Sequence, residues 1–221
     1  MPVLEVKNLI AGYGMEEPVV NDISFRLGAG ETLGLCGKSG SGKTTVIWAI
    51  MGVLRRFGGY AGGEVIYKGR NLLGLDKKNW KTLRWSRLAL VPQSSMNALN
   101  PVYTVGWTFN EMLRVHKERN MDSMAKIPLL LNSVGLGIDD LNRFPHELSG
   151  GMKQRASIAL AMLFDPEILI LDEATSGLDV IIEADILKLL RKLQEQRGLS
   201  MIFVSHDRRI TGEFCHRRID L

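Results

Sequence analysis

The stretch that decides the fold reads Gly37-Lys38-Ser39-Gly40-Ser41-Gly42-Lys43-Thr44. It directly follows an apolar run, Thr32–Cys36, and it opens a helical pattern at Lys43–Gly52. Glycines let the backbone curl so that several N–H groups point at one anion, and a helix that begins there adds its positive dipole end. A glycine loop between a buried strand and a helix therefore predicts a phosphate site. The alternative is an ordinary glycine-rich junction between a strand and a helix.

The loop also fits the pattern G-x-x-x-x-G-K-[ST], whose residues have separate tasks on a nucleotide. Lys43 is expected to neutralise the β- and γ-phosphates, and the hydroxyl of Thr44 is expected to bind Mg²⁺. The residues expected to contact the nucleotide here are Gly37, Lys38, Ser39, Gly40, Ser41, Gly42, Lys43, Thr44 and Thr45.

Short apolar runs indicate a parallel sheet that is covered on both faces. Besides Thr32–Cys36, the runs are Ile168–Leu171 and Met201–Val204, and polar or glycine residues follow each of them closely. The first 30 residues alternate instead, which predicts an N-terminal antiparallel β layer with a hairpin turn at Gly28-Ala29-Gly30.

Helical patterns lie between and beyond these runs. Ser149 is a good N-cap for a helix over Gly150–Phe164, and an apolar stripe predicts another helix over residues 182–198 that ends at Gly198. Residues 107–144 have the character of a helical insert. The chain is therefore predicted to be α/β.

Polar residues at the ends of the apolar runs are candidates for chemistry. Asp172 follows Leu171 and is expected to hold Mg²⁺, while Glu173 is expected to polarise a water molecule against the γ-phosphate. His206 ends another strand beside the same phosphate, and Gln93 is expected to complete the Mg²⁺ shell. Tyr13 is expected to stack on adenine. The alternatives are a solvated strand end for the two carboxylates, a structural role for the histidine, and exposed loop positions for the glutamine and the tyrosine.

Composition sets outer limits on the function. The 221 residues include 45% hydrophobic and 24% charged residues, which suits a globular domain, and the net charge of +4 is too small to choose among partners. Two distant cysteines, Cys36 and Cys215, fit a reducing compartment. The sequence has no apolar run approaching the roughly 18 residues of a membrane span, and no signal peptide is recognised. Any membrane role is expected to proceed through another subunit.

The family resemblance comes from residues 148–152. Leu148-Ser149-Gly150-Gly151-Met152 resembles the LSGGQ signature of ABC ATPases, and Ser176-Gly177-Leu178-Asp179 is similar to their D-loop. The glycine loop, signature, acidic strand, D-loop and His206 occur in that family's order. The resemblance implies a P-loop NTPase with a mostly parallel core sheet, an N-terminal antiparallel β layer and an α-helical subdomain that carries the signature.

The resemblance further implies how such a domain works. It implies a single domain over residues 1–221, with a RecA-like core at 1–93 and 165–221 and a helical subdomain at about 94–164. ATP and Mg²⁺ bind between two such domains packed head to tail, where Ser149, Gly150, Gly151 and Asp179 serve the partner's nucleotide. Permease subunits hold the pair at the cytoplasmic face of the membrane. The C-terminal part of the usual family domain is expected to be absent.

A narrower resemblance concerns the transported substrate. Met152 in the signature and Ser95–Pro101 after Gln93 resemble the peptide-importer branch, which serves dipeptides, oligopeptides and, in some members, nickel. Glu173-Ala174-Thr175-Ser176-Gly177 departs from the branch's usual Glu-Pro-Thr-Thr-Ala. The alternatives are a soluble ABC ATPase that acts on nucleic acid or ribosomes and a regulatory nucleotide binder without activity. A nucleic-acid partner is not expected.

Overall fold

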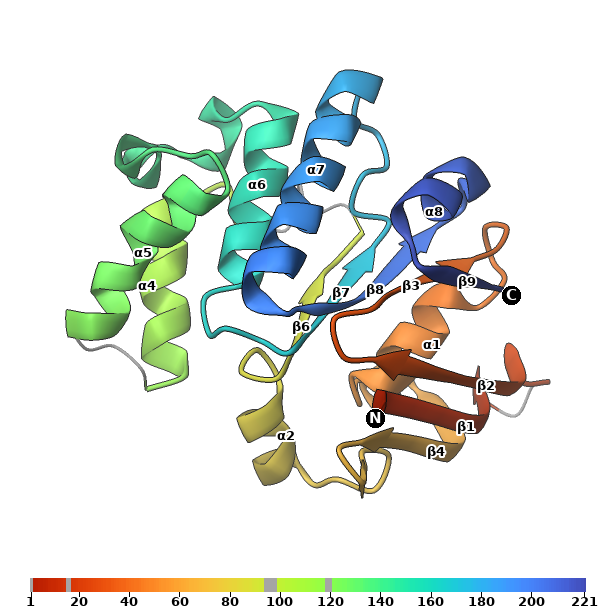
Figure 1. The fold of residues 1–221 in the computed structure, drawn as a ribbon. Coiled ribbons are helices and arrows are strands. Elements are labelled where there is room, and N and C mark those ends of the chain that lie inside the picture. The colour runs from red at the N-terminus through yellow and green to blue at the C-terminus, as the bar shows by residue number, and fades with distance from the viewer. Residues whose placement is uncertain (1, 15–16, 94–98, 118–120) are drawn as a thin grey trace.

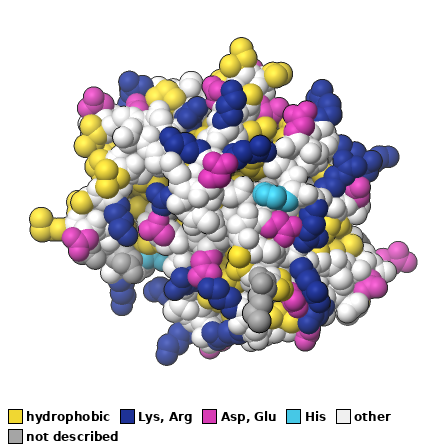
Figure 2. Space-filling model, viewed as in Figure 1, with side chains coloured by type: hydrophobic (Ala, Val, Ile, Leu, Met, Phe, Trp, Pro, Cys, Tyr) yellow, Lys and Arg dark blue, Asp and Glu magenta, His cyan; other side chains and the backbone are white. Residues whose placement is uncertain are grey.

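The computed structural model describes residues 2–14, 17–93, 99–117 and 121–221. Two β-sheets and the helices around them form the molecule (Figure 1). On the face drawn in Figure 2, Lys and Arg side chains are interspersed with Asp and Glu side chains. The small basic excess is therefore not gathered into one stripe on that face.

The central sheet is parallel and has five strands. Their order is β6 (Leu88–Val91), β7 (Ile168–Asp172), β8 (Ser200–Ser205), β3 (Thr32–Cys36) and β9 (Arg217–Asp220). Every residue of β3, β7 and β8 is buried, as the continuous apolar runs predict. Each neighbouring pair is parallel, so the carboxyl ends of all five strands lie at one edge.

The second sheet is antiparallel, and it confirms the predicted β layer. Its order is β2 (Val20–Gly28), β1 (Pro2–Tyr13), β4 (Gly59–Tyr67) and β5 (Arg70–Asn71). The predicted hairpin at Gly28-Ala29-Gly30 is wrong, because β2 and β3 belong to different sheets. The turn at Gly30, where φ is +68°, instead carries the chain from the antiparallel layer into the parallel core. Both arrangements need the same turn residues, so local sequence could not separate them.

Helices cover both faces of the parallel sheet. They are α1 (Lys43–Ile50), α2 (Lys77–Leu83), α4 (Val105–Val115), α5 (Met121–Ser133), α6 (Gly150–Ala161), α7 (Val180–Arg197) and α8 (Arg208–Phe214), with short 3-10 turns η1 (Leu54–Phe57), η2 (Ile138–Asn142) and η3 (Pro145–Glu147). Ser149 caps α6 and Gly198, at φ +61°, ends α7, as predicted. Helices α4, α5 and α6 lie together on the β6 side of the sheet (Figure 1).

Alternation along β7 divides the apolar interior into two cores. Leu169 and Leu171 pack with helices α4 to α7, whereas Ile168 and Ile170 pack with α1 and the antiparallel layer. Period-two alternation in a strand covered on both faces produces this division. The rigid sandwich that results positions the loops at the carboxyl edge.

Candidate active site

The glycine loop curls as the sequence predicts. Gly40 and Gly42 have φ values of +83° and +94°, a region that side chains other than glycine rarely adopt. A Cβ atom on Gly42 would also lie 2.9 Å from Cγ2 of Val20. Glycine is therefore required here both for backbone conformation and for space.

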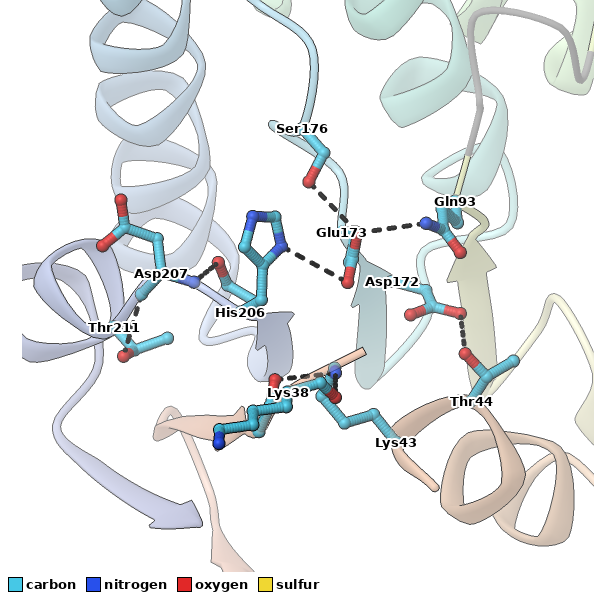
Figure 3. Close-up of polar contacts among 12 residues, drawn as sticks. Lys38, Lys43, Thr44, Gln93, Asp172, Glu173, Ser176, His206, Asp207 and Thr211 are labelled. Carbon is cyan, nitrogen blue, oxygen red and sulfur yellow. Dashed lines mark hydrogen bonds and ion pairs between the residues drawn. The ribbon is translucent and has the colours of Figure 1, made fainter. Parts of the chain in front are cut away.

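Lys43 lies across this loop (Figure 3). Its Nζ donates hydrogen bonds to the carbonyl oxygens of Gly37 at 2.8 Å and Lys38 at 2.7 Å, and the residue is buried. The loop thus encloses a positive charge. Helix α1 begins at the same point without a side-chain cap, so its first N–H groups are available to an anion.

Asp172 and Thr44 meet beside the loop. The Thr44 hydroxyl lies 3.4 Å from Oδ2 of Asp172, and Oδ1 of Asp172 is buried without a hydrogen-bond partner among the described residues. Burial, and then the charge of Glu173, raise the pKa of Asp172 to about 6. An orphaned carboxylate oxygen next to a hydroxyl is a donor set that fits a hard cation such as Mg²⁺.

Glu173 connects three segments of the chain (Figure 3). Its Oε2 accepts hydrogen bonds from Nε2 of Gln93 at 3.0 Å and from the hydroxyl of Ser176 at 3.3 Å. Its Oε1 lies 3.5 Å from Nδ1 of His206. Glu173 also has a φ of +48°, a backbone conformation that is uncommon for residues other than glycine. We refer to Gln93, Glu173, Ser176 and His206 as the Glu173 cluster.

The sheet explains why these residues meet. Gln93 follows β6 by two residues, Glu173 follows β7 directly, and His206 follows β8 directly. Parallel neighbours end at one edge, so residues far apart in sequence converge there. Ser176 was predicted only as part of the D-loop pattern, and its contact with Glu173 depends on the turn after β7.

Tyr13 lies near the start of α1. It ends β1, it is half-buried, and its hydroxyl oxygen lies 3.4 Å from the hydroxyl oxygen of Thr45. The antiparallel layer thus brings an aromatic ring to the side of the glycine loop.

The signature residues lie apart from the Glu173 cluster. Ser149 is exposed and accepts a hydrogen bond from the backbone N–H of Met152 at 3.3 Å, and Gly151 packs on Ile182 of α7. Asp179 accepts bonds from the backbone of Ile181 and Ile182 at the start of α7. Among the described residues, no hydrogen bond or ion pair joins Ser149, Gly151 or Asp179 to the Glu173 cluster. Residues 95–98 of the segment Ser95–Pro101 lie outside the described residues.

A glycine loop that encloses a lysine, a helix that begins at this loop, and two carboxylates at the end of strand β7 together define a nucleotide-binding α/β domain of the P-loop class. A family model described as ABC transporter matches residues 20–176. The chain therefore belongs to the ABC transporter family, and it is an ATP-binding, ATP-hydrolysing domain.

Curated relatives and solved structures agree with this family. A protein of Sinorhizobium fredii described as "Probable peptide ABC transporter ATP-binding protein" is 38% identical over 98% of this chain and 67% of its own length. The dipeptide transport ATP-binding protein DppD of Lactococcus lactis is 37% identical over 97% of this chain and 64% of its own length. The chain thus spans about two thirds of the length of these relatives.

The solved structures match over almost the whole chain. CbiO1 of Clostridium perfringens is described as part of the ABC transporter complex cbiONQ. It has a TM-score of 0.86 at 26% identity, and the match covers 99% of this chain and 84% of the CbiO1 chain. The dimeric structure of the cassette MJ0796 has a TM-score of 0.83 at 28% identity, over 99% and 94% of the two chains.

No helix within the described ranges is long and apolar enough to cross a membrane.

Proposed function

We propose that this chain is the ATP-driven motor of an importer for dipeptides or oligopeptides. The observation that carries the ATP-driven part of the proposal is the Glu173 cluster, which gathers Gln93 and His206 around a carboxylate at the carboxyl edge of the sheet, next to the contact between Asp172 and Thr44. The names of the relatives, which refer to peptide and dipeptide transport, support peptides as the substrate class.

Nucleotide binding is assigned to the glycine loop and its neighbours. The backbone of residues 37–45 surrounds the phosphates, and Lys43 exchanges its bonds with Gly37 and Lys38 for phosphate oxygens. Tyr13, beside the start of α1, stacks on the adenine ring.

Oxygen atoms of Thr44, Asp172 and Gln93 would hold Mg²⁺, and the bound ion would supply positive charge to the phosphate oxygens. Glu173 accepts the proton of the attacking water molecule, while His206 donates a hydrogen bond toward the γ-phosphate. Gln93 now bonds Glu173, so turning toward the cation would also free this carboxylate to hold water.

A second copy, or a related domain, completes the site. Ser149, Gly150 and Gly151 at the start of α6 lie apart from this chain's own cluster, and a helix start with a serine hydroxyl is a good anion site. We assign these residues and Asp179 to the nucleotide of the partner domain. The dimeric state in which MJ0796 was solved supports this arrangement.

The remaining partner is a permease at the cytoplasmic face of the membrane. We assign its docking groove to the segment Gln93–Pro101 and the helices after it, within a helical subdomain at about 94–164 set against a core at 1–93 and 165–221. Gln93 donates a hydrogen bond to Glu173, so this segment can connect nucleotide state to the permease.

The experiment that tests the proposal replaces Glu173 by Gln. The amide cannot accept the proton, so ATP turnover is expected to fall by about two to four orders of magnitude while ATP binding is retained. Phosphate release and calorimetry measure the two properties, and Glu195→Gln on the exposed face of α7 is the matched control. Parental turnover in Glu173→Gln would remove Glu173 from the proposed role.

A further inference from the structure

A cavity lies at the far end of helix α1, away from the glycine loop. It has a volume of about 490 Å³ and is bounded by the end of α1, turn η1, strand β4 and helix α2. The apolar part of its wall consists of Ala49, Leu54, Ala61, Leu73, Leu75 and Trp80. Helix α1 has 8 residues, so its two ends are separated by about 12 Å.

The charged part of the wall is strongly unbalanced. Four cationic side chains line the cavity, Arg55, Arg56, Lys77 and Arg84, against one carboxylate, Asp76. That carboxylate is already engaged, because its Oδ1 accepts bonds from both the backbone N–H and Nδ2 of Asn79 at 2.8 Å. Across the described ranges of the chain, none of the four cations forms an ion pair with a carboxylate.

Several cations elsewhere in the described residues do form ion pairs with carboxylates. Arg87 pairs with Glu167 at 2.9 Å, Arg114 with Glu111 at 2.6 Å, and Arg209 with Asp207 at 2.8 Å. The cavity at the end of α1 instead brings four cations together with one carboxylate, and no ion pair among the described residues joins them.

Arg84 makes this wall rigid. Its Nε donates to the carbonyl oxygen of Met51 at 3.0 Å, its Nη2 donates to that of Gly52 at 2.9 Å, and the guanidinium lies 4.7 Å from the centre of the Trp80 ring. Burial, and then the charge of Arg56, lower the pKa of Arg84. A half-buried cation that faces a second cation is stabilised when an anion binds between them.

Contact between Gly52 and Trp80 completes the wall. Gly52 has a φ of +61°, and a Cβ atom there would lie 2.2 Å from the Trp80 ring. Guanidinium and indole are thus held in place before any ligand arrives, which lowers the entropic cost of binding.

We propose that this cavity binds a small organic anion that carries a carboxylate, sulfonate or phosphate group on an apolar body. The volume and the apolar floor suit a ligand of drug-like size, and the cations at the rim orient its charged group. The site is separate from the nucleotide site and goes beyond the proposed transport function.

The probe for the test is anilinonaphthalene sulfonate, an apolar fluorophore with one anionic group. Its fluorescence is titrated against the full chain with Mg·ATP present in excess, so that the nucleotide site is filled. Phenylnaphthylamine, which has a similar ring system without the sulfonate, is titrated in parallel. The sulfonate is expected to bind more tightly than the neutral compound, with an affinity that falls as salt is added.

The deciding variant is the double substitution Arg55→Gln with Arg56→Gln, because both residues are exposed and neither supports α1. It is expected to weaken sulfonate binding by about tenfold or more and to leave the neutral compound unaffected. The control, Lys78→Gln with Lys81→Gln, removes the same charge from α2 residues outside the cavity wall. Equal weakening in both double variants, or equal binding of the two compounds, overturns the proposal.

Discussion

Helices α1 and α6 both begin in glycine-bearing sequence, yet their first turns have different surroundings. Lys43 at the start of α1 is buried against the glycine loop, and Thr44 lies 3.4 Å from Asp172. Ser149 before α6 is exposed and bonds only its own helix within the described residues. Both helix starts can attract an anion, but only α1 lies beside groups that could act on one.

Both helix starts can bind an anion, but the groups that could act on a bound phosphate lie at only one of them. The α1 end has a lysine, a carboxylate pair and the Glu173 cluster. The α6 end has backbone N–H groups and one hydroxyl. A shared site between two chains follows if the α6 end serves the partner's phosphate, and the substitutions below test each end in turn.

Among substitutions at the two helix starts, the largest effect is expected from the lysine at the start of α1. Lys43→Ala removes the cation that faces the phosphates, so ATP affinity is expected to fall at least about tenfold, the value of a charge-assisted contact. Calorimetry measures the affinity. Lys153→Ala, in the first turn of α6, is the matched control and is expected to leave ATP affinity of the single chain unchanged. Equal ATP affinities of the two variants would contradict the claim that the start of α1, and not the start of α6, binds the ATP of the single chain.

The glycines that precede or begin these helices should also differ. Gly42→Ala places a side chain at φ +94° and 2.9 Å from Val20, so it is expected to lower the free energy of unfolding by about 2 kcal/mol. Gly151→Ala places its Cβ 2.8 Å from Cγ2 of Ile182 but keeps an ordinary helical backbone, in which Ala is favoured over Gly, so the loss should be smaller, about 1 kcal/mol. Urea unfolding measures both. A more damaging Gly151→Ala would mean that α6, and not α1, is the constrained start.

Asp172, beside the start of α1, should make the stability of the chain depend on pH. Its pKa is about 6 in the folded chain against an ordinary value of 3.8, so between these values the folded state binds more protons. With a chelator present to remove Mg²⁺, the free energy of unfolding is therefore expected to fall by about 1 to 2 kcal/mol as pH rises from 4 to 6. Asp172→Asn should remove this fall and leave a more stable chain at pH 7. Thermal unfolding of both proteins across that range provides the test, and parallel pH profiles would show that Asp172 carries no such penalty.

The smallest effect is expected at the start of α6. Ser149→Ala loses an N-cap, which costs about 1 kcal/mol of stability, and ATP affinity of the single chain should remain nearly unchanged. Turnover by Ser149→Ala should be lower than turnover by the parental chain, because Ser149 serves the nucleotide of a second copy. For the same reason, turnover per chain should rise with protein concentration. Rates over a wide concentration range, paired with light scattering, test this.

Thr104→Ala is the matched control for Ser149→Ala. Thr104 caps α4 in the same way, accepting from the N–H of Trp107 at 3.2 Å. Thr104→Ala should lose about as much stability as Ser149→Ala, but its turnover should remain at the parental level. A constant high rate from a monomer, or equal rates in the two variants, would contradict a shared site.

Much of this architecture was predictable because it rests on local signals. The apolar runs Thr32–Cys36, Ile168–Leu171 and Met201–Val204 became buried parallel strands, and the cap at Ser149 began a helix. Strand β6 was missed, although Leu88-Ala89-Leu90-Val91 is a short apolar run before Pro92. Strand β9 gave no signal, since an edge strand that reads Arg217-Arg218-Ile219-Asp220 has little apolar character.

By itself, the sequence determined the glycine loop, the buried strands, the order of the motifs and the family, because each depends on residues close together in the chain. Only the tertiary structure decided that the turn at Gly30 joins two sheets, that Gln93, Ser176 and His206 all reach Glu173, and that four cations share one cavity behind α1. Strand order and the packing of α1 and α2 set these contacts. They arise between segments tens of residues apart, and no local propensity encodes them.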